Sequence, residues 1–481
     1  MKHGRAIIVL VAMLATAAAG AQETTLGMAV EEVGTALQIS TGDAVQRVCG
    51  QLAMRNVQGT LEGDAQDLFF RCREMVQTAN RIEMNDGDET NDLGLAPVQL
   101  AGALQQLAGE ENASKGRLAT ETSGGQFANI GLRIDAIARG ARATTGPGAL
   151  AMGGRDLEAD ESPASGGNAG DDLSGGGWGW FTTGALGSGD RDGSSREDGY
   201  DFDSYGLTLG ADYQFQNGFV LGAGLGYSDF QVDFDDLSPG AVASTAAGGD
   251  IEVDGFSLST FGVHDIGQFT LDGILTYGRN DYELERIVRF QAPAPGISDV
   301  DRLITGETDS TQWAAGIDVG RTFSWGATSL YVDGGFNWLD IRIDGYTEND
   351  PAGGLNLTYG DQDIESLQSV LGFQLARTFG WARGVATPYV QAHWRHEFDN
   401  DSQTLIARYA AFDAAFPELR GDPSFNLSFN TDEPDNDVFD VGVGIGLQFA
   451  FNFFAFLDYS QTVALDQGDA HLVSIGVRGA F

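Results

Sequence analysis

The chain has 481 residues and a formal net charge of −42, with 68 glycines and two cysteines. This length suits two structural parts better than one ordinary domain. The acidic balance excludes nucleic acid as a partner, because phosphate binding requires clustered lysine and arginine. Solvated loops are one explanation for so many carboxylates, and divalent-cation binding at a cell surface is the other.

Residues 1–21 are predicted to form a secretory signal peptide. Lys2 and Arg5 give a basic start, Ile7–Ala19 is an apolar core, and Ala19-Gly20-Ala21 is a small-x-small cleavage pattern. The apolar run is too short to span a membrane as a helix, and no later stretch is apolar enough to do so. The chain is therefore expected to be exported into an oxidising compartment.

Residues 22–145 are predicted to form a small helical region. Apolar residues recur at helical spacing in two arms, with a turn between them at Gly59 and Gly63. These residues are Val45, Val48, Cys49 and Leu52 in the first arm, and Leu61, Leu68, Phe69, Cys72 and Val76 in the second. Cys49 and Cys72 lie one in each arm, so a disulfide across the hairpin is expected in preference to two free thiols.

Two further helices are expected before the composition changes. One lies at Pro97–Glu111 and one at about Gln126–Arg142, where isoleucines at helical spacing share a face. Residues 146–177 are rich in Gly, Ala, Ser and Asp, and such a stretch cannot bury enough apolar surface to order itself. It is predicted to be a linker that tethers the helical region or threads a pore.

From residue 178 onward, apolar and polar residues alternate with a period of two, which predicts strands with two different faces. Val441 and Val443 alternate with glycine, and Val473 and Ile475 lead into Arg478 on the other face. A face of glycines and an arginine suits the lumen of a transmembrane antiparallel β-barrel, with the apolar face toward lipid. Twelve strands are expected, an even number as closure requires. Their expected bounds are Gly177–Ser188, Tyr200–Phe215, Phe219–Phe234, Asp250–His264, Gln268–Ile287, Glu307–Ser324, Thr328–Asp344, Asp363–Phe379, Ala386–Phe398, Asp437–Ala450, Phe453–Ala464 and Ala470–Phe481.

The connections fit the same architecture. Short turns such as Gln216-Asn217-Gly218 alternate with long links such as Asp399–Asn436, as in barrels with short periplasmic turns and long outer loops. Aromatic residues cluster near the expected strand ends, as interfacial girdles require. By strand parity, Arg395, Glu397 and Arg478 are predicted to project into the lumen, as a wall network or as contacts to a plug.

Residues 178–481 resemble the translocator domain of classical autotransporters, the type V secretion family. The resemblance rests on the order and spacing of segments Gly177-Trp178-Gly179-Trp180, Leu271–Gly278, Pro388–Gln391 with His396-Glu397-Phe398, and His471–Phe481. It implies a twelve-stranded barrel in the Gram-negative outer membrane, with outer-membrane lipid and the barrel-assembly machinery as partners. Phe481 would be the assembly signal. The helix at Gln126–Arg142 would be the linker helix that occupies the pore after export, with Asn129 and Arg133 at the matching positions.

One position departs from the family pattern. Autotransporters that cut themselves inside the barrel use paired asparagines at this helix, whereas here Ala128 precedes Asn129. Alanine has no side-chain amide to attack a backbone carbonyl, so the helical region is expected to stay attached to the barrel.

Three functions are compatible with these features. The first is a barrel that translocates or displays the helical region at the cell surface, for interaction with or adhesion to a host or surface ligand. A channel is the second, and a hydrolase in the barrel wall is the third. The sequence has no G-x-S-x-G, HExxH or nucleotide-binding motif, so no catalytic, cofactor or metal site is expected. Arg420-Gly421-Asp422, in the longest loop, is attributed to chance.

Overall fold

The computed structural model describes residues 25–84, 90–138, 177–236, 241–244, 247–399, 401–449 and 453–480. The expected signal peptide at residues 1–21, the linker at residues 146–176 and the assembly signal Phe481 lie outside these residues.

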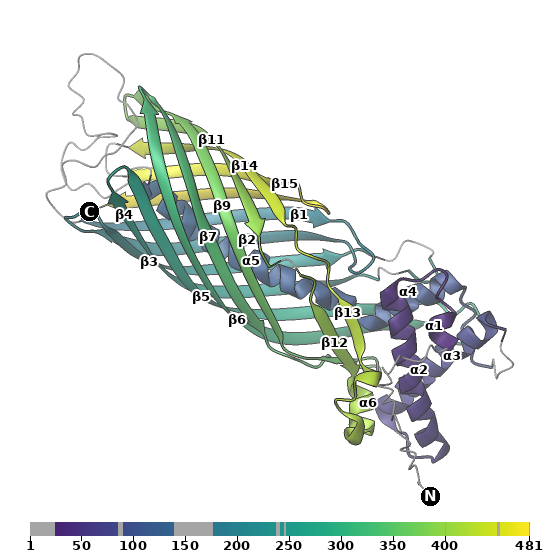
Figure 1. The fold of residues 1–481 in the computed structure, drawn as a ribbon. Coiled ribbons are helices and arrows are strands. Elements are labelled where there is room, and N and C mark those ends of the chain that lie inside the picture. The colour runs from purple at the N-terminus through teal and green to yellow at the C-terminus, as the bar shows by residue number, and fades with distance from the viewer. Residues whose placement is uncertain are drawn as a thin grey trace, which may run out of the picture.

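A barrel forms the C-terminal part of the molecule (Figure 1). Its strands are β1 (Gly177–Arg191), β2 (Tyr200–Gln214), β3 (Val220–Phe234), β4 (Gly249–Ile266), β5 (Phe269–Phe290), β6 (Val300–Trp325), β7 (Thr328–Ile343), β9 (Gln362–Arg377) with β10 (Phe379–Trp381), β11 (Gly384–Glu397), β14 (Asp437–Phe449), β15 (Phe453–Val463) and β16 (Asp469–Ala480). Strands β9 and β10 both pair with β11 and so form one wall strand. The first and last strands, β1 and β16, pair antiparallel, which confirms a closed barrel of twelve strands.

Most strand bounds differ from the expected ones by one to three residues, but β6 begins at Val300 rather than Glu307. Leu303 and Ile304 are adjacent apolar residues there, so the alternation that marks a strand is obscured. Leu303 is half exposed, whereas Ile304 is buried against the helical part of the chain. The extra length of β6 therefore lies in a part of the barrel that packs on protein and not on lipid.

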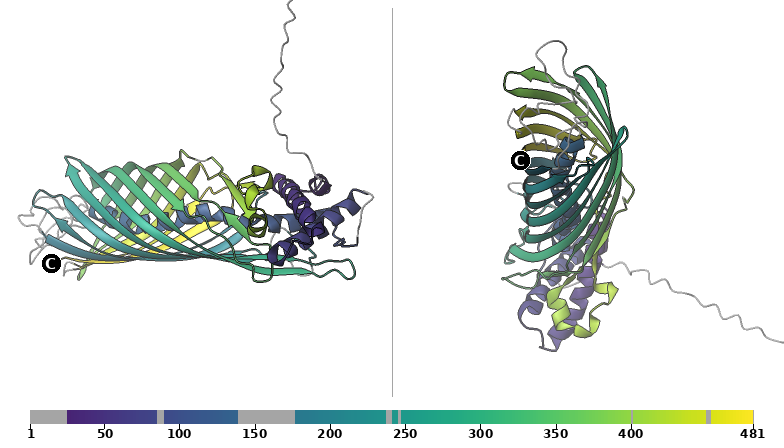
Figure 2. Two further views of the ribbon diagram at one scale, coloured as in Figure 1. Left: turned by 90° about the horizontal axis from the view of Figure 1, so that it is seen from below. Right: turned by 90° about the vertical axis from the view of Figure 1, so that its left-hand side faces the viewer.

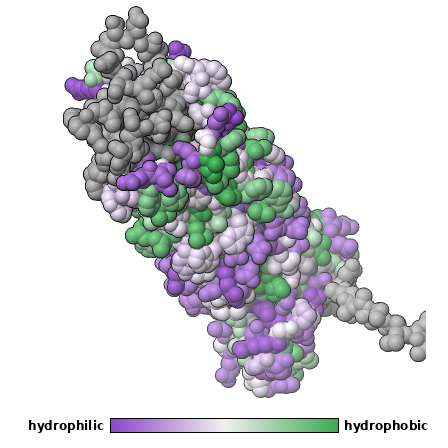
Figure 3. Space-filling model, turned by 60° about the vertical axis from the view of Figure 1, so that its left-hand side comes forward, coloured by the Kyte–Doolittle hydropathy of each residue, from purple (hydrophilic) through white to green (hydrophobic). Residues whose placement is uncertain are grey.

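Two rows of aromatic residues bound an apolar belt on the outside of the barrel. Toward the long loops, the rings of Tyr227 and Phe256 lie 5.1 Å apart and those of Tyr277 and Trp313 lie 4.9 Å apart. Toward the short turns, the rings of Trp178 and Tyr213 lie 5.1 Å apart. Large exposed apolar side chains fill the belt between these rows, including Leu209, Leu225, Leu258, Leu275, Ile317, Phe336, Leu371, Val443 and Ile475. Figure 3 shows hydrophobic residues gathered over the barrel strands and hydrophilic ones toward the helical end.

Beyond the aromatic row on the long-loop side, the strands continue but the character of their faces is reversed. The outward positions are acidic: Asp254 of β4, Asp281 of β5 and Asp309 of β6 lie directly opposite one another across the strands. The inward positions are apolar, as at Ile251 and Leu284, which are buried. Apolar residues thus face outward within the belt and inward beyond it.

The inward apolar face of these extensions packs against the N-terminal helices. These are α1 (Thr25–Met28), α2 (Ala36–Val57), α3 (Gly63–Ile82) and α4 (Pro97–Ala108), followed by the short η1 (Glu110–Ala113) and α5 (Ser114–Ala138). Helices α1–α4 lie beyond the long-loop end of the barrel, and α5 runs back inside it (Figures 1 and 2). Among the described residues, no helix has both the length and the apolarity to cross a membrane.

The helical hairpin is built as expected. Thr35 starts α2 with a capping box, in which its side chain and that of Gln38 each bond the other residue's backbone N–H. Gly59 and Gly63 adopt left-handed φ angles of 67° and 57° in the turn to α3. Cys49 and Cys72 are joined by a disulfide between α2 and α3, with their Cα atoms 5.6 Å apart.

Two long loops add a small sheet that the sequence did not predict. It consists of β8 (Leu357–Tyr359), β12 (Thr404–Tyr409) and β13 (Leu427–Asn430), with α6 (Ala410–Ala415), η2 (Pro417–Leu419) and η3 (Pro423–Phe425) between β12 and β13. This sheet, the extended strands and helices α1–α4 share one hydrophobic core. We call helices α1–α4 and this small sheet with its helices the cap.

We expect a charge within the belt to impair insertion far more than the same charge beyond it. Leu225→Arg places a cation where the side chain is 66% exposed to lipid, at a cost of about 2–4 kcal/mol near the midplane. Gln231→Arg, on the same face of β3 but beyond Tyr227, is the matched control. The measurement is the amount of folded, heat-modifiable protein in membranes, and equal losses for the two variants would contradict the assignment of the belt.

Candidate functional site

The lumen of the barrel is occupied by α5. Glycines on four wall strands face this helix, at Gly206, Gly224, Gly255 and Gly316. A Cβ atom at each would stand 2.7 or 2.8 Å from a side-chain atom of Asn129, Ile130, Gln126 or Phe127, respectively. The absence of side chains at these wall positions therefore leaves the room that the helix needs.

Gln126 ties α5 to two parts of the wall that lie three strands apart. Its amide nitrogen donates to the Ser228 hydroxyl on β3 at 2.6 Å, and its amide oxygen accepts from Gln312 on β6 at 2.8 Å. Asn280 of β5 donates in turn to the Gln312 oxygen at 3.3 Å. All of these groups are buried, so each bond is worth more than a solvated one.

Arg133 forms the charged contact between α5 and the wall. Its Nε and Nη2 donate to the same oxygen of Asp212 on β2, at 2.9 and 2.7 Å. Arg478 of β16 approaches the other oxygen of Asp212 at 3.8 Å. The side chains of Arg133 and Asp212 are only 3% and 1% exposed, and breaking one partner of such a buried pair typically costs about 3–5 kcal/mol.

The C-terminal half of α5 is held by apolar packing against the wall. Ile130, Ile134 and Ile137 are buried in a second hydrophobic cluster with wall residues such as Phe181 and Phe261. The helix begins at Ser114, twelve residues before its expected start at Gln126, and it is described to Ala138. Its first half contains Lys115, Gly116 and Arg117, which do not form the isoleucine pattern by which the second half was found.

The other predicted lumen residues have different surroundings. Arg395 pairs with Asp440 of the neighbouring strand β14 at 2.7 Å, as part of the wall network. Glu397 was expected either in a wall network or in contact with the plug, and its carboxylate accepts hydrogen bonds from Ser366, from Gln368 and from the backbone of Leu367, all within the wall. It therefore joins β11 to β9 and the following loop.

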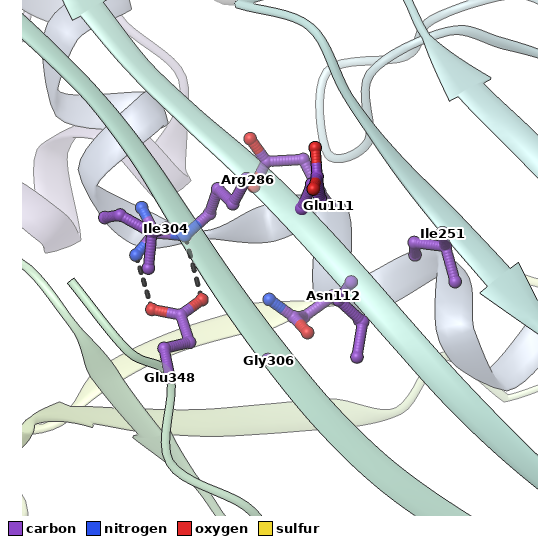
Figure 4. A pocket seen from close by; sticks show the side chains of 9 residues that line it. Glu111, Asn112, Ile251, Arg286, Ile304, Gly306 and Glu348 are labelled. Carbon is purple, nitrogen blue, oxygen red and sulfur yellow. Dashed lines mark hydrogen bonds and ion pairs between the residues drawn. The ribbon is translucent and has the colours of Figure 1, made fainter. Parts of the chain in front are cut away.

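A second polar site, which the sequence did not predict, lies where the cap meets the long-loop end of the barrel. Arg286 of β5 makes a two-bonded ion pair with Glu348, at 2.9 and 2.6 Å, and donates at 3.0 Å to the carbonyl oxygen of Gln106 on α4. Figure 4 shows Arg286 directed at Glu348, with Glu111 and Asn112 of η1 lining the same small pocket. No local pattern marks this pair, because its members are 62 residues apart.

Buried carboxyl groups surround this ion pair. Burial raises the pKa of Glu111 to about 8 and that of Asp198 to about 6, and it also raises the pKa of Glu110. Burial lowers the pKa of Lys115, whose ammonium lies 4.3 Å from the ring centre of Tyr346, to about 7. The junction between cap and barrel is therefore sensitive to proton binding.

Asn129 of α5 and Asp212 of the wall differ in how much of their position the sequence predicts. Asn129, which the resemblance put at a matching position of the pore helix, is buried against Gly206. Asp212 falls on the inward face of β2 and was identifiable by parity, but its pairing with Arg133 depends on how deep α5 lies in the barrel.

We expect enlargement of a helix-facing glycine to displace the plug. In Gly224→Leu the new side chain occupies the position of the Ile130 side chain, and such overpacking costs about 1–3 kcal/mol. The pore of the full-length protein in planar bilayers would then conduct more often. Gly184→Leu, where a Cβ has no neighbour closer than 3.7 Å, is the control. Similar opening by both variants, or by neither, would contradict the packing described.

We expect the docked cap to lose stability as the pH rises from about 5 to about 7, by on the order of 4 kcal/mol. The pKa values of Asp198 and Glu111 are higher when docked, about 6 and about 8, so the docked state binds more protons. Their contribution is full below the ordinary carboxyl pKa and is lost as the pH rises through these values. The lowered pKa of Lys115 acts mainly above about 7 and opposes this loss there.

The measurement is the thermal unfolding of the helical signal at the two pH values. The double substitution Glu111→Gln with Asp198→Asn should flatten the pH dependence of the unfolding temperature. Glu62→Gln, at the exposed residue immediately before α3, should not change it. A dependence unchanged by the double substitution would refute the assignment.

The comparisons with known proteins agree with this architecture. A family model described as the autotransporter beta-domain matches residues 180–460. A solved translocator domain of the autotransporter NalP from Neisseria meningitidis is 16% identical, over 64% of this chain and 90% of that chain, with a TM-score of 0.47. The beta domain of the Bordetella autotransporter BrkA is 17% identical, over 63% and 100%, with a TM-score of 0.40. A search of curated proteins finds no match. Since the family model spans more than half of the sequence, this chain belongs to the autotransporter family, whose β-domain is a translocation barrel of the Gram-negative outer membrane.

Proposed function

We propose that this autotransporter carries its own N-terminal helices through the barrel and keeps them at the cell surface as an attached cap. The observation that carries the proposal is the shared hydrophobic core of helices α1–α4, the small sheet and the barrel extensions. A passenger destined for release would have little reason to bury its apolar surface on its own translocator.

Contacts between the N-terminal helices and the rest of the chain support a fixed position. Arg302 of β6 donates to Asp67 of α3 at 3.1 and 3.3 Å. Arg286 reaches the backbone of α4, as described above. On α2, the guanidinium of Arg55 stacks over the Phe416 ring at 4.2 Å, in the loop between β12 and β13. Contacts thus reach α2, α3 and α4 from β5, from β6 and from the loop between β12 and β13.

The chemistry at Asn129 supports retention as well. Ala128 replaces the first asparagine of the self-cleaving pattern, and Asn129 itself lies inside α5 and is buried against the wall. In a helix, a side-chain amide cannot reach the backbone carbonyl of its own residue without unwinding the turn. The proposal therefore includes no self-cleavage at this helix.

A channel is the alternative function. The hydrogen bonds of Gln126 and the ion pair of Arg133 hold α5 in the lumen, so the resting protein is expected to be closed. The role proposed for the exposed cap is contact with a host or surface ligand. In the Arg420-Gly421-Asp422 turn, the Asp422 carboxylate already accepts bonds from Ser424 at 3.0 and 2.6 Å, which disfavours this tripeptide as the contact.

Protease shaving of intact cells tests the display. We expect antibodies to residues of α2 and α3 to bind intact cells, and the untreated protein to migrate as one chain that contains both the cap and the barrel. Protease should remove the cap epitope and leave the β14–β16 epitope protected.

As a control, Arg302→Gln with Arg55→Gln weakens the docking of helices α1–α4 but leaves their tether, so these helices should become more sensitive to protease and remain attached. A separate barrel fragment in cells without surface proteases would contradict retention. A cap epitope that is accessible only after lysis would contradict display.

A further inference from the structure

The Arg133–Asp212–Arg478 site contains a feature that the plugged state does not explain. The side chain of Arg478 is only 7% exposed, and its Nε and Nη2 make no hydrogen bond among the described residues. One oxygen of Asp212, Oδ1, likewise has no hydrogen-bond donor among the described residues. A buried guanidinium and a buried carboxylate oxygen are costly to leave without partners, and here the two lie 3.8 Å from each other.

The wall is shaped so that these two groups can meet. Asp212 lies on β2 and Arg478 on β16, and β1 runs between them. The residue of β1 opposite Asp212 is Gly179. A Cβ there would stand 2.9 Å from Asp212 Oδ1, 3.2 Å from Arg478 Nη2 and 3.3 Å from Arg478 Nε. Glycine at this position therefore keeps open the path by which the two side chains approach across β1.

The location is the seam of the barrel, where the last strand pairs with the first. An ion pair between β2 and β16 spans three strands and clamps that seam independently of backbone pairing. In the plugged state, both donated bonds at Asp212 Oδ2 come from Arg133 of α5, and the seam pair Asp212–Arg478 is 3.8 Å long.

We propose that Asp212 changes partners when α5 enters the pore. Before α5 arrives, Asp212 pairs with Arg478 and clamps β2 to β16 across Gly179. When α5 enters, Arg133 captures the carboxylate and Arg478 is left with its longer contact. Asp212 thereby acts as a positioning residue twice, first for the closed seam and then for the plug. The exchange concerns the pore alone and holds whether or not the cap stays at the surface.

Competition for one carboxylate makes the two arginines distinguishable. Arg133→Gln removes the bonds to the plug, so the full-length protein in planar bilayers should open more often, by on the order of a hundredfold. Arg478→Gln removes the competitor, so openings should not increase. Asp212→Asn should open like Arg133→Gln. Arg279→Gln, at an exposed ion pair beyond the belt, is the matched control and should leave openings unchanged.

The heat resistance of the folded band in gels provides the second measurement. Arg133→Gln alone should retain most of it, because Arg478 takes over Asp212. Arg133→Gln with Arg478→Gln should lose more than the sum of the single losses, because neither partner remains. If the double variant fails to assemble, Arg133→Gln with Gly179→Ala replaces it, since the added Cβ blocks the approach of Arg478 and should give the same excess loss.

Two results would overturn the exchange. One is an increase in opening by Arg478→Gln comparable to that of Arg133→Gln, which would make Arg478 a simple plug contact. The other is additive heat resistance in both double variants, which would show that Arg478 does not replace Arg133 at Asp212.

Discussion

The structure depends on the fact that the same strands face lipid along one part of their length and a polar environment along the rest. Within the aromatic rows the outside is lipid, where every backbone polar group must be paired and every outward side chain must be apolar. Beyond the aromatic row on the long-loop side, the outward face of the strands is polar, and the same strands carry their apolar residues on the inward face. The inward face of the extensions then needs a protein partner, and helices α1–α4 provide one. The position of the cap thus follows from where the belt ends.

The same reversal separates two kinds of interior. Inside the belt the lumen wall is rich in glycine, and α5 is held there by directed contacts through Gln126 and Arg133 and by the packing of its isoleucines on wall residues such as Phe181. At the mouth the interior is apolar, and polar groups such as Arg286 and Glu348 are fully enclosed. The glycine-lined wall leaves room for a single helix to enter the first environment, whereas the second encloses several helices and favours a fixed, packed domain.

The sequence predicted the barrel well because lipid imposes a pattern that each strand shows by itself. Val443 and Ile475 identified their strands through alternation alone. The pattern fails where a segment faces protein: the first residues of β6 and the small sheet in the long loops were not recognised. Glu397 shows a related limit, since parity gave the side of the strand but not the neighbouring backbone that its carboxylate binds. The Arg286–Glu348 pair joins distant segments and has no local signal.

The disulfide between Cys49 and Cys72 has a consequence for the order of events during export. The two cysteines are 23 positions apart, and their bond closes that stretch into a covalent ring. A ring cannot pass a narrow opening as a single thread, because two lengths of polypeptide must go through side by side. In the proposed route, if the two cysteines are oxidised before passage, the pore must be wide enough for two polypeptide segments. If they are oxidised afterwards, a pore wide enough for one extended chain suffices. The time at which two sulfur atoms meet then decides how wide the transporter has to open.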